Sequence, residues 1–149
     1  MKALNCERGA VELKTPRPTV GAFVFNPRGK FLLVKSSGKW GGKWLIPGGG
    51  IDFGETSEDA LRREFREETG LELHSIELLE VEEVINPSDF HEEEHFIFFD
   101  FYAKTDSEDV KLNDEANEFK WVLIDEALEM DLNASTRKAL ERFKVRKHG

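Results

Sequence analysis

Short runs rich in β-branched and aromatic residues most limit what this chain can fold into. Such residues favour strands, and turn signals such as NPRG (26–29) separate the runs. The first two runs therefore predict a hairpin, and GGG (48–50) is expected to break the third strand. The expected strands are TVGAFVF (19–25), KFLLVK (30–35), WLIP (44–47), most of 71–85, HFIFFDFYAKT (95–105) and EFKWVLI (118–124).

Two helices are expected among these strands. Thr56 is predicted to cap the first, with Asp59 completing a capping box and Gly70 ending the helix. A helical turn is predicted over 125–130, and Asn133 is predicted to cap a last helix over 134–146. Strands before, between and after two helices predict a mixed α/β fold with helices packed against a sheet.

The first helix carries three glutamates where like charges repel. Glu64, Glu67 and Glu68 are three and four residues apart, so they form one patch on the helix. The patch lies along or beside the apolar stripe instead of opposite it, and Arg63, one turn before Glu67, can hold that carboxylate. The stripe consists of Ala60, Leu61 and Phe65, whereas Arg62 and Arg66 point away from it.

Two interpretations of this patch compete: a solvated, arginine-balanced surface helix, or a metal site. Carboxylates crowded beside a core have raised pKa values unless a cation compensates them, which favours the metal site. The preceding segment PGGGIDFGE (47–55) lets the backbone approach a ligand closely and offers bare carbonyl and N–H groups. A carboxylate cluster facing a glycine loop suits Mg²⁺ bound together with substrate phosphates.

Length and charge narrow the functional classes. The 149 residues are most simply one domain, with 21 basic and 30 acidic side chains and a net charge of −9. This charge argues against stable nucleic-acid binding, but not against a small anionic substrate that binds with a divalent cation.

Cys6 is the only cysteine, so an internal disulfide and a cysteine-based structural zinc site are excluded. The N-terminus lacks a signal-peptide core and no apolar run approaches the about 20 residues of a membrane span, so we expect a cytoplasmic protein without a membrane partner.

The segment 49–71 resembles the signature of a known family. Gly49, Glu55 and the run REFREETGL (63–71) match every specified position of the Nudix box. The resemblance implies a hydrolase of nucleoside diphosphates linked to another group, dependent on Mg²⁺ or Mn²⁺, with an α/β/α sandwich fold and a mixed sheet. It implies that Glu64, Glu67 and Glu68 serve as metal ligands or as the general base and that Arg63 orients them. It also implies that the backbone carbonyl near Gly48 coordinates the metal.

The tail at 111–140 is similar to a narrower branch of the same family, the bacterial nucleoside triphosphatases that prefer pyrimidine deoxynucleotides. The shared features are NDE (113–115), Trp121, and DLN (131–133) followed by Thr136 and Arg137. In related enzymes an acid six residues before the tryptophan reaches the metal from a loop, and here that acid is Glu115. Residues 1–16 have no recognised counterpart and are taken as an N-terminal extension of a single Nudix domain.

Several candidates have a plainer explanation. Glu55 is expected to fix the glycine loop more than to bind metal, Trp44 and Trp121 are expected to pack in the core, and Arg137 is expected to be solvated. Trp40 could stack on a base or simply pack. HEEEH (91–95) matches a zinc motif that requires a helix, but the segment runs into a strand and is therefore set aside.

The expected activity is Mg²⁺-dependent hydrolysis of a nucleoside triphosphate to the monophosphate and pyrophosphate, with Glu67 or Glu64 as general base. Two alternatives stay open. One is a pyrophosphatase for ADP-ribose or a nucleotide sugar, and the other is a non-catalytic Nudix module that senses a nucleotide. Either a monomer or a homodimer is compatible with the sequence.

Overall fold

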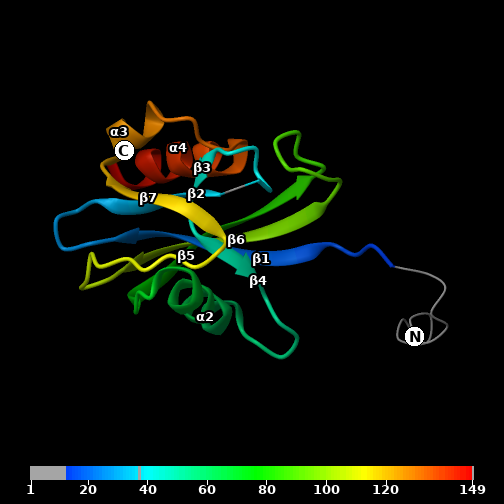
Figure 1. Ribbon diagram of the computed structural model, residues 1–149, viewed down its shortest axis with the longest axis horizontal. Coiled ribbons are helices and arrows are strands. Elements are labelled where there is room, and N and C mark those ends of the chain that lie inside the picture. The colour runs from blue at the N-terminus through cyan, green and yellow to red at the C-terminus, as the bar shows by residue number, and fades with distance from the viewer. Residues whose placement is uncertain (1–12, 37, 149) are drawn as a thin grey trace.

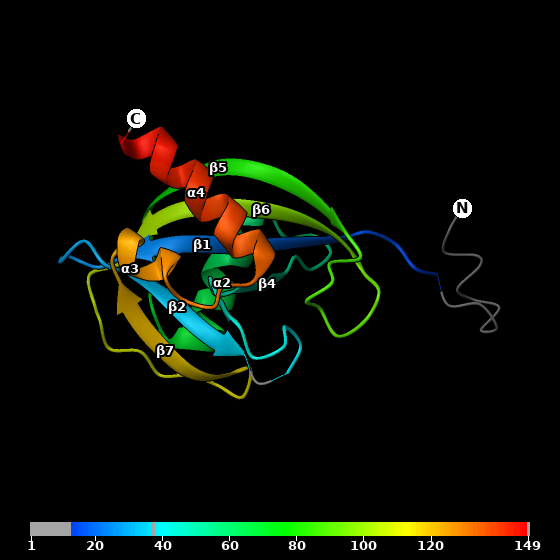
Figure 2. The same ribbon diagram turned by 90° about the horizontal axis from the view of Figure 1, so that it is seen from above.

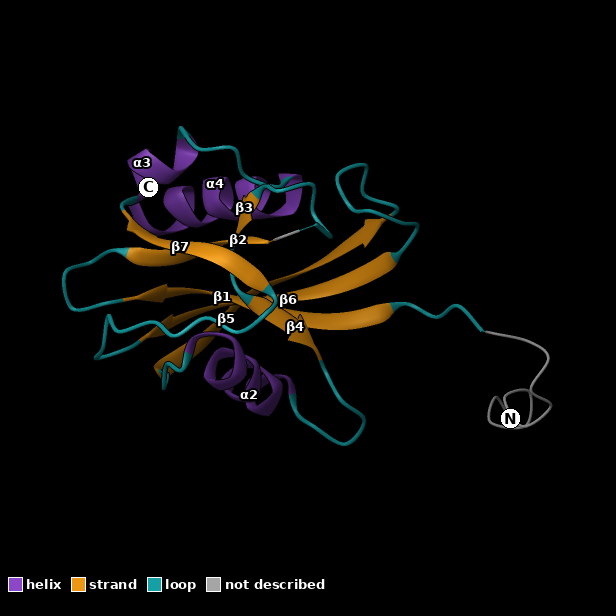
Figure 3. Ribbon diagram, in the orientation of Figure 1, coloured by secondary structure: helices purple, strands orange, loops and turns teal. Residues whose placement is uncertain are grey.

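The computed structural model describes residues 13–36 and 38–148, which form a seven-stranded mixed sheet between helices. Helix α2 covers one face of the sheet, and α3 and α4 cover the other (Figures 1 and 3). The predicted α/β/α sandwich is confirmed. The elements are β1 (Arg17–Phe25), β2 (Phe31–Ser36), β3 (Trp44–Leu45), β4 (Gly48–Gly50), α2 (Ser57–Thr69), β5 (His74–Ile85), β6 (His95–Lys104), β7 (Ala116–Val122), α3 (Ile124–Leu128) and α4 (Ala134–His148).

Strand β1 lies at the centre of the sheet and is apolar on both faces. Val20, Ala22 and Val24 belong to the core under α2, whereas Phe23 belongs to the core under α4. Burial of both faces explains why the run TVGAFVF does not alternate between apolar and polar residues. β1 pairs in parallel with β6 from Arg17↔Phe96 to Phe25↔Lys104, and this pairing makes the sheet mixed.

Next to β1 the sheet divides. β1 and β2 form the expected hairpin, but the register joins them only at Phe25↔Phe31. Towards its N-terminus β1 pairs instead with β4, while β2 pairs with β3 and β7. In Figure 2, β2 and β7 therefore run at an angle to β1 and β6. The division leaves room for a pocket between the two halves of the sheet.

Both long helices begin at the predicted caps. The Thr56 hydroxyl accepts a hydrogen bond from the Asp59 N–H at 3.1 Å, and the Asn133 side chain accepts one from the Thr136 N–H at 2.9 Å. Gly70 ends α2 in the left-handed conformation, with φ of 76°. The predicted wheel of α2 is confirmed for Ala60, Leu61, Glu64, Phe65 and Glu68, which are all buried, but not for Glu67, which is exposed.

The glycine run 48–50 was predicted to break the third strand. That strand does end before the run, at Leu45, but the run itself is regular structure, which the prediction missed. It forms strand β4, which pairs with Thr19–Gly21 of β1. A Cβ at Gly48 would lie 1.9 Å from the Val20 carbonyl oxygen, so only glycine allows the two backbones to approach this closely. The strand predicted from residue 71 begins at His74, because Leu71 and Leu73 turn into the core under α2.

Arg137 also differs from its prediction. Its guanidinium is not solvated but donates to the carbonyl oxygens of Leu128 at 3.0 Å and Met130 at 2.7 Å. These carbonyls lie at the end of α3, where helix acceptors lack internal partners. Arg137 therefore fastens α4 to α3. Trp44 and Trp121 pack against the two cores, as predicted.

The structure does not describe residues 1–12, 37 and 149. Cys6 and most of the extension 1–16 lie outside the described residues. Within the described residues, no helix is long and apolar enough to cross a membrane.

The packing of β4 predicts different effects of alanine at two neighbouring glycines. Gly48→Ala should lower the free energy of unfolding by about 2 kcal/mol or more, because its Cβ meets the backbone of β1. Gly50→Ala is the matched control, since a Cβ there meets nothing within 4 Å. Thermal or urea unfolding of both variants checks this, and equal stability of the two would contradict the close β1–β4 contact.

Candidate metal centre and active site

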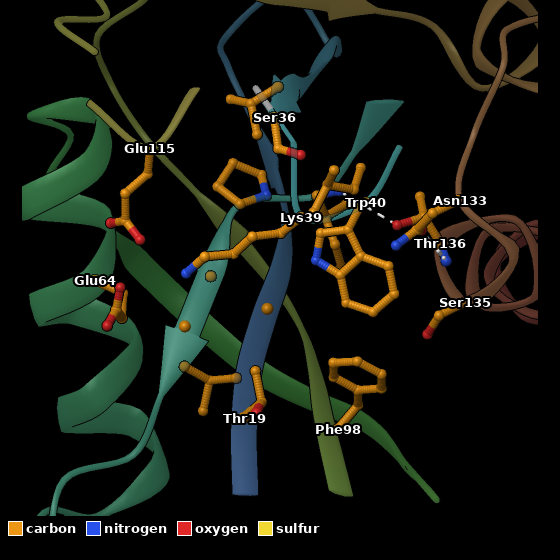
Figure 4. A pocket seen from close by; sticks show the side chains of 18 of the residues that line it. Thr19, Ser36, Lys39, Trp40, Glu64, Phe98, Glu115, Asn133, Ser135 and Thr136 are labelled. Atoms are coloured by element: carbon orange, nitrogen blue, oxygen red, sulfur yellow. Dashed lines mark hydrogen bonds between the residues drawn. The ribbon is translucent and has the colours of Figure 1, made fainter. Parts of the chain in front are cut away.

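Three carboxylates converge at one place. Glu64 and Glu68 come from α2 and Glu115 from the loop before β7, and one oxygen of each lies within 4.8 Å of the others. Glu64 and Glu68 are only 8% and 7% exposed, whereas Glu115 is exposed. The structure thus brings together residues that the sequence separates widely, and Figure 4 shows Glu64 and Glu115 facing each other.

The loop reaches this position by bonding to the end of α2. The N–H groups of Lys111 and Asn113 donate to the carbonyls of Thr69 at 2.9 Å and Glu68 at 3.3 Å. These carbonyls belong to the last turn of the helix, where acceptors have no partner within the helix. The Asn113 side chain then accepts from the N–H of Glu115 at 2.9 Å, which fixes the start of β7 beside the helix.

Burial and mutual repulsion make the cluster electrostatically costly without a cation. Burial raises the pKa of Glu64, although its bonds to Arg63 oppose this. Burial, followed by the charges of Glu115 and Glu64, raises the pKa of Glu68 to about 9. Glu68 Oε2 is buried and has no hydrogen-bond partner among the described residues. Three carboxylates, one of them with an unpaired buried oxygen, provide the oxygen ligands that a hard divalent cation prefers.

The glycine strand closes one side of the cluster. A Cβ at Gly49 would lie 2.3 Å from the Glu64 carboxyl carbon, so glycine is required for β4 to pass this close to the carboxylate. The backbone of Gly48 hydrogen-bonds Glu68 and favours its charged form. A role of the Gly48 carbonyl in binding metal stays a prediction.

Arg63 connects the glycine strand to the carboxylates of α2. Its guanidinium donates to the Gly50 carbonyl at 3.0 Å, to Glu64 at 3.0 Å and to Glu67 at 3.2 Å. It also pairs with Glu55 at 2.7 Å, and these bonds hold the pKa of Glu55 down at about 2. Glu55 in turn accepts from the Asp52 N–H at 2.9 Å. The prediction that Glu55 fixes the glycine loop is confirmed by these contacts.

Glu67 lies apart from the three converging acids. Its side chain is 54% exposed and is bonded to Arg63, so it stands on the solvent side of the same helix turn. Its role as ligand or base stays a prediction, as do the roles of Glu64, Glu68, Glu115 and Arg63.

A pocket of about 370 Å³ opens from the cluster through the division of the sheet. Glu64, Glu68 and Glu115 line one end, and Trp40 and Phe98 line the other (Figure 4). Trp40 is 9% exposed and its ring centroid is 4.5 Å from that of Phe90. It packs on neighbouring rings, which confirms the packing interpretation, and it also faces the pocket, so stacking on a base stays a prediction. Other lining groups come from the first turn of α4 and from β1 and β6, among them Thr19, Asp100, Asn133, Ser135 and Thr136.

Sequence reasoning missed the part that β6 plays in this pocket. Phe96, Phe98 and Asp100 alternate with core residues and so face the pocket side of the sheet. An aspartate inside an otherwise aromatic run was the available signal. The segment 91–95, by contrast, is not helical, so its exclusion as a zinc helix is confirmed.

Comparison with known proteins agrees with this geometry. Residues 15–143 match the family model of the NUDIX domain. The chain belongs to the Nudix family. A relative, the nucleoside triphosphatase NudI of Escherichia coli, is 35% identical over 121 residues, which are 75% of this chain and 86% of that protein.

Solved structures of Nudix proteins share the fold. The MutT protein from Methanosarcina mazei has a TM-score of 0.75 and 30% identity, covering 93% of this chain and 100% of that one. The MutT NUDIX hydrolase from Burkholderia pseudomallei has a TM-score of 0.72 and 30% identity, covering 86% and 98%. The NUDIX domain of Shewanella oneidensis NrtR, complexed with ADP ribose, has a TM-score of 0.74 at 23% identity, covering 96% and 97%. This chain is therefore a Nudix hydrolase, and Gly49, Glu64 and Glu68 of its box line the pocket.

The raised pKa of Glu68 predicts how the stability of this Nudix hydrolase depends on pH. Between about pH 5 and 9 the native state keeps a proton that the unfolded chain has released, so metal-free stability should fall as pH rises. Glu68→Gln should remove this loss of stability, because glutamine carries no ionisable proton. At pH 8 the metal-free variant should be more stable than the parent by about 1 kcal/mol or more, roughly 2–4 °C in Tm, with the difference vanishing near pH 5. Calorimetry in a chelator checks this, and a variant less stable than the parent at pH 8 would contradict it.

Proposed function

We propose that this Nudix hydrolase is a Mg²⁺-dependent nucleoside triphosphate pyrophosphohydrolase, which converts its substrate to a nucleoside monophosphate and pyrophosphate. The observation that carries the proposal is the pocket that joins an acidic end to an aromatic end. Glu64, Glu68 and Glu115 suit a cation-bound phosphate chain, whereas Trp40 and Phe98 suit the flat, apolar faces of a base. A nucleotide has these two parts in the same order.

Similarity to relatives supports the triphosphate as substrate. The Escherichia coli protein that is 35% identical is named a nucleoside triphosphatase. The features shared with the pyrimidine-preferring branch, NDE (113–115), Trp121 and DLN (131–133), lie outside the catalytic box. They therefore bear on the substrate more than on the chemistry. We propose pyrimidine deoxynucleotides as the preferred class.

Mg²⁺ would be held by Glu64, Glu68 and Glu115, with Glu67 and the Gly48 carbonyl as further predicted ligands and Mn²⁺ as a substitute. When bound, the ion would neutralise phosphate charge and lower the pKa of the attacking water. This positive charge matters because the chain carries a net charge of −9 and its substrate is also anionic. Such a cation would also relieve the repulsion that raises the pKa of Glu68.

The residues of the chain would contribute positioning and a base. Glu64 or Glu67 takes a proton from water as the water oxygen bonds to phosphorus, and the bond from that phosphorus to the bridging oxygen breaks, releasing pyrophosphate. Arg63 donates to both glutamates and to the Gly50 carbonyl, so it holds either base at a fixed distance from β4. Glu55 keeps Arg63 in that position.

The competing functions are a pyrophosphatase for ADP-ribose or a nucleotide sugar and a nucleotide sensor. The NrtR domain bound to ADP ribose resembles this chain at 23% identity, which supports the fold alone. The complete set of carboxylates favours an enzyme over a sensor, since binding alone does not require all of them. Since nucleotides are cytoplasmic metabolites, a nucleotide substrate suits a cytoplasmic enzyme. The net negative charge suits a monomer or homodimer with no nucleic-acid or membrane partner.

Neutralising the acids tests the metal centre. Glu64→Gln, Glu68→Gln and Glu115→Gln should each lower kcat by about tenfold or more while the circular dichroism spectrum is retained, because each removes a ligand charge. In each variant the rise of Tm with millimolar Mg²⁺ should also shrink. Glu83→Gln, an exposed acid on β5, is the control and should match the parent. Parent-like turnover in all three cluster variants would refute this metal centre.

A substrate panel tests the specificity. With Mg²⁺, kcat/KM should be higher for dCTP, dTTP and dUTP than for dGTP and ADP-ribose, and pyrophosphate should be the released product. Differences among bases should stay near the about 1–3 kcal/mol that apolar and stacking contacts provide, unless a polar group reads the base edge. Leading activity on ADP-ribose would replace the proposed function by the pyrophosphatase alternative.

A further inference from the structure

Asp100 is a buried acid that lines the pocket and is not one of the three converging carboxylates. It is 4% exposed, and its Oδ2 has no hydrogen-bond partner among the described residues. By strand alternation it faces the same side of the sheet as Phe98, two residues earlier on β6. Both residues line the same pocket as Glu64 and Glu68.

A glycine and a glutamate flank Asp100 on the neighbouring strands. Across the sheet, Asp100 pairs with Gly21 of β1 on one side and with Glu80 of β5 on the other. Paired residues point to the same face, so Gly21 itself places no side chain beside Asp100, and the Ile46 side chain lies 3.2 Å from where a Cβ of Gly21 would stand. The next row of the sheet places Thr19 beside Phe98, and both line the pocket as well.

Charged groups around Asp100 are engaged with one another. Glu80 and Glu82 of β5 lie within 4.8 Å of it, and Arg142 of α4 pairs with these glutamates at 2.6 and 3.3 Å. Arg146 of α4 donates to the Leu79 carbonyl. Burial, followed by the charges of Glu80 and Glu82, raises the pKa of Asp100 to about 8; a hydrogen bond with Glu80 acts in the same direction and Arg142 opposes it. The group is therefore largely neutral at pH 7.

We propose that Asp100 is a specificity-determining residue that hydrogen-bonds the polar edge of the substrate's base in the pocket. A protonated carboxyl group offers a donor beside an acceptor, and base edges such as the amino group and N3 of cytosine present the complementary pair. A buried polar group without a partner is unfavourable, so a ligand that supplies one gains affinity. This inference rests on the proposed function for the identity of the ligand as a nucleotide.

A second cation between Asp100, Glu80 and Glu82 is the competing explanation. The guanidinium of Arg142 already supplies positive charge there through its bonds to both glutamates. The aromatic rings on the pocket side of Asp100 also suit a base more than a hydrated ion.

The test compares two variants on two substrates. Asp100→Asn keeps a neutral donor and acceptor, whereas Asp100→Leu has similar size and neither group. Substrates are dCTP and the base-free 1′,2′-dideoxyribose 5′-triphosphate. Asp100→Leu should raise KM for dCTP about tenfold, with kcat within about threefold of the parent, and should leave KM for the base-free substrate unchanged. Asp100→Asn should stay within about threefold of the parent KM on both substrates.

A pH series separates this role from a structural one. KM of the parent for dCTP should rise from pH 7 to 9 as Asp100 loses its proton, and Asp100→Asn should lack this rise. This comparison needs only the conservative variant, so it holds even if Asp100→Leu does not fold. A loss in Asp100→Leu that is equal on both substrates, or an identical pH profile in the parent and Asp100→Asn, would overturn the proposal.

Calorimetric binding of dCMP separates this inference from the proposed function. If the parent hydrolyses no nucleoside triphosphate but binds dCMP, and Asp100→Leu weakens that binding about tenfold, the proposed function fails and the role of Asp100 stands. If the parent hydrolyses dCTP and Asp100→Leu binds dCMP as the parent does, the function stands and the role of Asp100 fails.

Discussion

The arrangement of the site depends on one guanidinium group. Arg63 donates to the Gly50 carbonyl of β4 and to the carboxylates of Glu55 and Glu64. The strand and the helix are therefore held by one guanidinium group. Arginine suits this place because its planar fork donates in several directions at once and stays charged. Without Arg63, less positive charge would offset the repulsion between Glu64 and Glu68. Strand β4 would also lose a hydrogen bond to α2. The close β1–β4 contact and the orientation of the acids therefore depend on the same residue.

Two kinds of acid line the pocket. Glu64, Glu68 and Glu115 are crowded so that a cation would be favoured, whereas Asp100 is buried among rings and paired glutamates so that a proton is favoured. Both arrangements lower the stability of the ligand-free fold, because burial opposes ionisation in each case. The division of the sheet beside β1 makes them possible, since an unbroken sheet would fill this space with side chains.

Local sequence signals predicted much of this. Caps at Thr56 and Asn133, the wheel of α2 and the spacing of the box depend on residues near one another in the chain. Glu115 was predicted by resemblance to related enzymes, from its place six residues before Trp121. By contrast, β4, the contacts of Arg137 and the environment of Asp100 are set by residues distant in the sequence. A triple glycine is normally a break, and only the Val20 backbone opposite makes it a strand. Periodicity alone could not show that Asp100 shares a face with the pocket.

The parallel pairing of β1 with β6 has a consequence for folding kinetics. Arg17 meets Phe96 and Phe25 meets Lys104, so everything between these strands must be synthesised and looped back before the central ladder can close. Long-range pairing of this kind slows folding, whereas α2, with its own caps, can form locally and early. Because β4 and Asp100 both pair with β1, the pocket is complete only once this ladder has closed. A kinetic intermediate of this chain would therefore contain the Nudix helix and yet have no place for a nucleotide.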